Sequence, residues 1–353
     1  MKRVLGLAIC SLVLMLAAWM SFVAQGAAQG PPAWAYGTPP TAATVGTPAA
    51  APAPNSAAAP QAGAQAAPAT APAAPVDTTV RLLPGSSLEF TRAQISNGFG
   101  PADWYPGDHP LMPDVVARGR NPEARACALC HYPNGKGRPE NAGVAGLPVG
   151  YFIQQMNDYK AGNRKSAEPR KANTNAMIAI AKALTDEEIK AAAEYFGAMK
   201  WTPWIKVVET DTVPKTRIGG GMFLALAGTE KEPLGQRIIE MPENTEATEI
   251  LRDPRSGFIA YAPVGSIKKG EALATTGGGK TVQCAVCHGA DLKGMGPVPG
   301  IAGRSPSYLV RQMYDMQQGA RKGMWTELMM PVVSKLSEED MLNIAAYTAS
   351  RIP

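Results

Sequence analysis

The chain has 353 residues, of which 45% are hydrophobic, and its formal net charge is +5 at pH 7. A chain of this length can form more than one hydrophobic core, so we expect more than one folded unit. Without Lys2 and Arg3, which lie in a predicted export signal, the chain carries only +3. A protein so close to neutral is not expected to bind nucleic acid.

Residues 1–26 have the composition of an export signal. Lys2 and Arg3 precede an apolar run from Val4 to Ala24, and small residues follow it. The run is about 20 residues long, which is enough to cross a bilayer if it is not cleaved. We therefore expect a signal peptide or an N-terminal membrane anchor through residues 4–24. The protein would be periplasmic, and either soluble or tethered to the inner membrane.

Residues 27–78 form a predicted leader that is rich in Ala and Pro and has no charged residue before Asp77. Such a composition cannot form a hydrophobic core, so the leader is expected to be disordered. If the anchor is retained, about 50 extended residues at about 3.1 Å each could hold a folded domain up to about 150 Å from the membrane.

Apart from Cys10, the cysteines occur only in two short motifs, each followed at once by a histidine. These are "CALCH", with Cys127, Cys130 and His131, and "CAVCH", with Cys284, Cys287 and His288. Cys-x-x-Cys-His is typical of covalent c-type haem attachment. On one helical turn the two thiols can form thioethers to the haem vinyl groups, and the next residue places an imidazole at the iron. The motifs predict two covalently bound haem c groups.

Three other uses of these cysteines are open in principle. An exported protein could form two disulfides, two Cys-x-x-Cys pairs could bind one zinc ion, and a thioredoxin-like site also uses Cys-x-x-Cys. None of them requires a histidine directly after the second cysteine. Two of the three histidines of the chain occupy that position, which favours haem.

The two motifs lie 157 residues apart, and the same offset relates the residues that follow them. Residues 142–165 match residues 299–322, including a Tyr, a Gln-Met pair and a Gly-x-Arg-Lys segment. The chain therefore contains a duplicated haem-binding domain. We expect the first copy over 79–200 and the second over 265–353.

Each copy ends in a predicted amphipathic helix. Thr185 and Ser337 are followed by acidic residues, which is typical of an N-cap and a first helical turn. The predicted apolar stripes comprise Leu184, Ile189, Ala192, Ala193 and Phe196 in the first copy, and Leu336, Met341, Ile344, Ala345 and Tyr347 in the second.

Methionine is the leading candidate for the sixth iron ligand. Met177 lies seven residues before Leu184, and Met329 lies seven residues before Leu336. Because Met330 follows directly, a slip of one residue in an irregular loop would make it the ligand instead. Met156 and Met313 also match between the copies, but their predicted helical context assigns them to packing.

These features together resemble the class I c-type cytochromes, and two such domains in tandem resemble the dihaem cytochrome c4 family. The resemblance covers residues 110–200 and 265–353. It implies two small, mainly α-helical domains with histidine–methionine ligation, and electron transfer between periplasmic or membrane-bound partners.

Residues 201–264 are longer than the connection expected in that family. They contain aromatic residues, β-favouring runs such as "WIKVVETDTV", and many Pro and Gly turns. We expect an ordered interdomain segment with short strands that packs on one or both haem domains.

The predicted function is that of a dihaem electron carrier, not of an enzyme. It would accept electrons from a membrane complex or a periplasmic dehydrogenase and pass them to a terminal oxidase or reductase of a respiratory chain. One alternative is a dihaem cytochrome c peroxidase. The other is the electron-transfer subunit of a periplasmic dehydrogenase complex.

Two further features bear on these alternatives. A peroxidase would employ extra histidine ligands, and His109, the histidine outside the motifs, is expected in a surface loop instead. A basic run beside the first haem domain is expected either to be a solvated face or to steer acidic partners. It consists of Lys160, Arg164, Lys165, Arg170 and Lys171.

Overall fold

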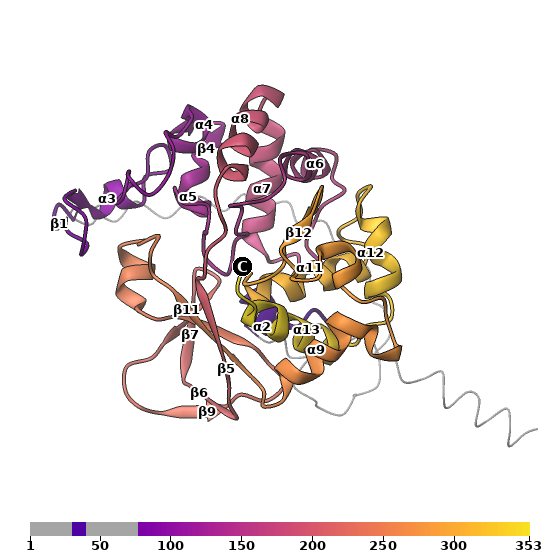
Figure 1. Ribbon diagram of the computed structural model, residues 1–353. Coiled ribbons are helices and arrows are strands. Elements are labelled where there is room, and N and C mark those ends of the chain that lie inside the picture. The colour runs from indigo at the N-terminus through magenta and orange to yellow at the C-terminus, as the bar shows by residue number, and fades with distance from the viewer. Residues whose placement is uncertain (1–29, 40–76) are drawn as a thin grey trace, which may run out of the picture.

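The computed structural model describes residues 30–39 and 77–353 (Figure 1). The predicted signal or anchor lies outside these residues, as does most of the predicted leader. Within the described ranges, no helix combines the length and the apolar character that a membrane span requires.

The first copy of the repeat is built from five helices. They pack around a core that includes Val116, Ile189 and Phe196. In chain order they are α4 (Asp114–Ala117), α5 (Cys127–His131), α6 (Val149–Lys160), α7 (Ala172–Ala183) and α8 (Asp186–Gly197), with the short hairpin β3 (Gly119–Arg120) and β4 (Ala124–Arg125) before α5.

An N-terminal extension precedes these helices and does not join their core. It holds a second small cluster around Trp104 and Tyr105, which also contacts Leu251 of the interdomain segment. Its elements are β1 (Val80–Arg81), β2 (Phe90–Thr91) and α3 (Arg92–Ile95).

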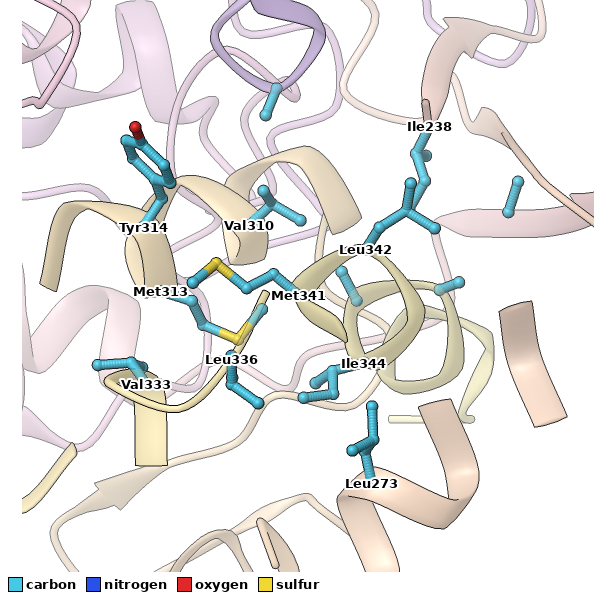
Figure 2. Packing of buried hydrophobic residues seen from close by; sticks show 14 of the residues in the cluster. Ile238, Leu273, Val310, Met313, Tyr314, Val333, Leu336, Met341, Leu342 and Ile344 are labelled. Atoms are coloured by element: carbon cyan, nitrogen blue, oxygen red, sulfur yellow. The ribbon is translucent and has the colours of Figure 1, made fainter. Parts of the chain in front are cut away.

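The second copy repeats the arrangement. Its elements are α9 (Ser266–Thr276), the 3-10 turn η3 (Gly277–Gly279), α10 (Ala285–His288), the hairpin β12 (Gly294–Met295) and β13 (Val298–Pro299), α11 (Pro306–Gln317), α12 (Thr326–Val333) and α13 (Glu338–Ser350). Figure 2 shows its core, where Val310 and Met313 of α11 meet Met341 and Leu342 of α13. The predicted fold class, two tandem helical domains, is confirmed.

Both C-terminal helices begin as their sequences predict. Thr185 accepts a hydrogen bond from the backbone of Glu188, whose side chain accepts one from the backbone of Thr185. Ser337 and Asp340 form the same capping box before α13. These caps satisfy backbone donors that a helix start leaves unpaired. All ten predicted stripe residues are buried.

The interdomain segment is ordered and contains short strands, as expected. Its central sheet places β11 (Phe258–Ala262) between antiparallel β10 (Ile239–Pro242) and parallel β5 (Ile205–Glu209). Two antiparallel pairs flank it, β6 (Thr212–Pro214) with β9 (Lys231–Pro233) and β7 (Thr216–Gly219) with β8 (Met222–Ala225). A π-helical turn, η2 (Glu246–Ile250), follows β10.

One part of the predicted disordered leader is folded. Residues 30–39 contain the short helix α2 (Ala33–Tyr36), which packs on α11, and the side chain of Tyr36 is 1% exposed. The expectation of disorder throughout 27–78 is therefore wrong for this stretch. Alanine and proline dominate the leader, but Trp34 and Tyr36 supply enough apolar surface for docking.

We predict that Gly270→Ala destabilises the second copy. A Cβ on Gly270 of α9 would lie 1.9 Å from the carbonyl oxygen of Asn343 on α13. Separating the two helices should lower the free energy of unfolding by about 1–3 kcal/mol in denaturant titrations of the haem-loaded protein. Gly150→Ala is the matched control, because nothing lies within 4 Å of that position. An equal loss in both variants would contradict the helix-contact explanation.

Candidate functional site

Both haem-attachment motifs lie on short helical turns. All five residues of "CALCH" form α5, whereas Cys284 of "CAVCH" is the residue preceding α10. No disulfide joins any two of the four motif cysteines. Within residues 30–39 and 77–353, no group of three His, Cys, Asp or Glu side chains is arranged to hold a metal ion. The disulfide and single zinc-site alternatives thus gain no support.

The two motif histidines have equivalent hydrogen bonds. Nδ1 of His131 lies 2.8 Å from the carbonyl oxygen of Ala142, and Nδ1 of His288 lies 2.7 Å from that of Pro299. A carbonyl oxygen can only accept a hydrogen bond, so Nδ1 carries the proton. Nε2 is then unprotonated, and its lone pair can bind a metal ion. Burial lowers the pKa of both histidines, which favours the neutral imidazole that metal ligation needs.

One continuous cavity joins the two copies. Its lining includes both motif histidines and the predicted methionines Met177 and Met329. Met330, the alternative to Met329, is not among the lining residues that the structure describes. The structure thus brings each predicted histidine and methionine to the same cavity.

The sequence predicted an irregular loop around Met329 and Met330, but the candidate methionines lie on helices. Met177 is on α7, and Met329 and Met330 are on α12. Adjacent side chains on a helix point about 100° apart, so Met329 and Met330 cannot exchange by a small slip of the chain. Met156 and Met313 are buried in the two cores, as expected of packing residues, and also border the cavity.

Two equivalent arginines cross the boundary between the copies. Arg164 donates to Gln155 in its own copy at 3.0 Å, and to Tyr308 and Gln312 of the other copy at 3.1 and 3.0 Å. Arg321 donates to Gln312 at 2.9 Å, and to Tyr151 and Gln155 at 2.9 and 2.8 Å. The duplicated segments therefore bind each other reciprocally.

Four buried guanidinium groups line the cavity. Arg164, Arg304, Arg311 and Arg321 are each 5–7% exposed, and none of them forms a salt bridge with a described carboxylate. Buried cations are costly unless an anion compensates them. Four haem propionates would supply such anions, so the donor set fits two haem groups.

This arrangement corrects the interpretation of the basic run. Arg164 and Lys171 are buried, so they are part neither of a solvated face nor of a surface that could steer a partner. Burial lowers the pKa of Lys171 to about 7. Sequence reasoning missed Arg304 and Arg311. The repeat could have flagged Arg164 and Arg321, because both belong to the matched Gly-x-Arg-Lys segments.

His109 is not the surface residue that the sequence predicted. Its side chain is 4% exposed, and its Nε2 lies 3.1 Å from Asp103. Its ring meets that of Tyr195 edge-on at 6.2 Å. It does not line the cavity described above, so the extra histidine ligand of the peroxidase alternative gains no support.

The two motif helices differ in their cover. Ala128 and Leu129 of α5 are 2% and 9% exposed, whereas Val286 of α10, which corresponds to Leu129 in the repeat, is 53% exposed. Arg252 of the interdomain segment donates to the carbonyl oxygen of Leu129 and lies over the ring of Tyr132 at 5.5 Å. The equivalent face of the second motif has no such cover among the described residues.

The N-terminal extension holds this cover in place. Trp104 donates to the carbonyl oxygen of Leu251 at 2.8 Å. Arg255 forms two hydrogen bonds of 2.7 Å with Asp108, and its guanidinium lies 3.6 Å from the ring centre of Tyr105. Among residues 30–39 and 77–353, those outside the helical cores therefore shield the first motif and not the second.

Comparisons with known proteins agree with this site. The Cytochrome c family model matches residues 116–200 and 267–351. A thiosulfate dehydrogenase electron acceptor from Stutzerimonas stutzeri is 27% identical over 236 residues, which span 66% of this chain and 82% of that protein. A cytochrome c-552 from Acidithiobacillus ferridurans is 31% identical over 272 residues, which span 75% and 85%.

Among solved structures, reduced cytochrome c4 from Pseudomonas stutzeri matches with a TM-score of 0.42 and 20% identity, over 64% of this chain and 93% of that chain.

The fold and the paired motifs define a dihaem c-type electron-transfer protein with two covalently bound haem c groups. The chain belongs to the cytochrome c family.

We predict that Arg164→Leu lowers the free energy of unfolding by about 2–4 kcal/mol. The substitution removes three hydrogen bonds from a charged donor, to the buried Gln155 and to the half-buried Gln312 and Tyr308, and a hydrogen bond to a charged group contributes about 1.5–3 kcal/mol. Denaturant titration of the haem-loaded protein measures the loss.

The control is Arg118→Leu, because the side chain of Arg118 is 74% exposed. Its effect should stay within about 0.5 kcal/mol. If Arg164→Leu were as mild as Arg118→Leu, the reciprocal contact would not hold the copies together.

Proposed function

We propose that each copy holds one haem through its own motif. Cys127 and Cys130 would form the thioethers in the first copy, and Cys284 and Cys287 in the second. His131 and Met177 would be the axial ligands of the first iron, and His288 and Met329 those of the second. The hydrogen bonds of both histidine Nδ1 atoms to carbonyl oxygens support this assignment.

We propose that the protein is a carrier and not itself an enzyme. When bound, the haem supplies one-electron redox chemistry, and a methionine ligand raises its potential. Met177 and Met329 would fill the sixth positions and so exclude oxygen and peroxide. The observation that carries the proposal is the cavity lined by the histidine and methionine of both copies, because two haem groups held there would lie beside each other.

We further propose that external redox proteins meet the second copy. The second motif is exposed at Val286, which is 53% exposed, and Met295 nearby is 56% exposed. Arg252 covers the first motif. Because electron transfer requires close approach of the two cofactors, a partner would reach the second centre, and the first centre would exchange electrons across the cavity.

A donor of defined chemistry is suggested by one relative. The protein from Stutzerimonas stutzeri is described as an electron acceptor of thiosulfate dehydrogenase. We therefore propose a periplasmic dehydrogenase, with thiosulfate dehydrogenase as the first candidate, as the electron donor, and a terminal oxidase or reductase as the acceptor. The second candidate function is that of an electron-transfer subunit in a dehydrogenase complex, and the description of the same relative supports this candidate as well.

The docked segment shortens any membrane tether. If residues 4–24 remain as an anchor in the inner membrane, residues 25–29 alone connect it to the docked residues. Even a fully extended link from Ala24 to Gly30 spans only about 20 Å. We propose that the folded part of a tethered form would lie close to the membrane surface. Its distance from the membrane would be far shorter than the roughly 150 Å that an undocked, extended leader could span.

We predict that Met177→Leu and Met329→Leu each remove about half of the far-red methionine–iron absorption band of the oxidised protein. Each substitution should also lower the potential of one haem, because leucine cannot ligate iron. Met330→Leu is the matched control and should leave the band and both potentials unchanged. Loss of the band in Met330→Leu with retention in Met329→Leu would reverse the assignment.

We predict that Val286→Lys slows electron acceptance from a redox protein at least about tenfold. A lysine on the exposed motif face would have to be desolvated in the encounter with an apolar partner surface. The measurement is stopped-flow haem reduction by thiosulfate dehydrogenase with thiosulfate. Leu111→Lys is the control, since Leu111 is 96% exposed on the first copy.

Equal slowing in the Val286 and Leu111 variants would contradict entry through the second copy. Fast peroxide turnover by the wild-type protein would instead support the peroxidase alternative.

A further inference from the structure

Residues 30–39 dock where the two copies and the interdomain segment meet. Figure 1 shows α2 beside α11, from which it is far in sequence. The hydroxyl of Tyr36 donates to Asp315 of the second copy at 2.6 Å. The ammonium group of Lys171, in the first copy, donates to the carbonyl oxygen of Tyr36 at 3.1 Å.

The third wall of this site belongs to the interdomain segment. Gly37 has a positive φ of 62°, and a Cβ there would lie 2.2 Å from the carbonyl oxygen of Gly221. The indole of Trp34 packs against two buried clusters that include Ile238 and Ile239. Only a glycine fits at position 37. The docking of the segment therefore requires this residue type and does not depend on apolar burial alone.

The hydrogen bonds to the segment come from charged side chains that also line the haem cavity. Arg311 donates to the carbonyl oxygen of Ala35 at 2.6 Å, and Asp315 and Lys171 bind Tyr36. All three side chains are among the cavity-lining residues. They therefore have the leader segment on one side and the cavity on the other.

We propose that this junction is an intramolecular peptide-binding site whose ligand is the chain's own segment 30–39, and that its occupancy sets the polarity of the haem cavity. While the segment is bound, it supplies hydrogen-bond partners to Arg311, Asp315 and Lys171 and covers the junction against water. When the segment is released, those three side chains bind water instead. The inference concerns the haem environment and is independent of which redox partners the protein meets.

Release of the segment has a predictable electrochemical effect. Water stabilises the more highly charged oxidised form of a haem, so hydration of the cavity lowers the reduction potential. The segment should therefore keep the potential of at least one haem higher than it would be with an open junction.

The test compares the full-length haem-loaded protein with a variant in which residues 30–39 are replaced by a Gly/Ser sequence of equal length. We expect a lower thermal midpoint and a lower potential for at least one haem. Adding the synthetic peptide GPPAWAYGTP should restore both values in a saturable manner. A peptide carrying Gly37→Ala should fail to do so, because its Cβ clashes with Gly221.

A second variant keeps the proposal testable if the replacement prevents folding. Tyr36→Phe removes one hydrogen bond to a buried carboxylate, and a Tyr36→Phe peptide should bind about tenfold more weakly. In the full-length protein, this variant should speed amide exchange within residues 33–38. Pro39→Ala, at an exposed position, should leave exchange unchanged.

Unprotected amides in residues 33–38 of the wild-type protein would overturn the binding site. Potentials that do not change when the segment is replaced would overturn its link to the haem cavity. Either result would leave the electron-carrier role intact, because that role is tested by haem reduction and ligation instead.

Discussion

The structure depends on the reciprocal contact of Arg164 and Arg321. Each guanidinium binds the glutamine of both copies and a tyrosine of the other copy. Backbone hydrogen bonds from Lys165 to Ala320 and from Lys322 to Asn163 join the same two segments. Because both partners come from one duplicated sequence, the contact has approximate twofold symmetry. It turns two haem-binding domains into one body with a shared cavity.

The residues outside the repeat break this symmetry. The two motif helices are nearly identical in sequence, yet Arg252 and the N-terminal extension cover the first and leave the second exposed. A symmetric dihaem protein would offer equivalent sites to partners. Here the first motif is covered and the second is exposed. The proposal that redox partners meet the second copy rests on this asymmetry.

The local features of the site could be predicted from sequence because they depend on short spacings. Cys-x-x-Cys-His needs only one helical turn, and the caps at Thr185 and Ser337 need only four consecutive residues. Met177 and Met329 were located by their constant distance from a matched leucine, and both reach the cavity. The roles of Arg164, Lys171 and His109 were misjudged, because hydrophilic side chains in loop-like sequence were expected at the surface. Their burial depends on segments more than 100 residues away, or on side chains such as Tyr195 that sequence proximity does not reveal.

The sequence by itself determined the haem chemistry, the duplication and the helical fold class, since motif spacing and apolar periodicity encode them directly. Only the tertiary structure decided which surfaces meet. It joined the two haem-binding copies around one cavity, covered one motif with Arg252, and docked Tyr36 of the leader against Asp315, 279 residues away. Such contacts arise from the packing of distant segments, and the cost of bringing those segments together depends on the whole fold and not on any local pattern.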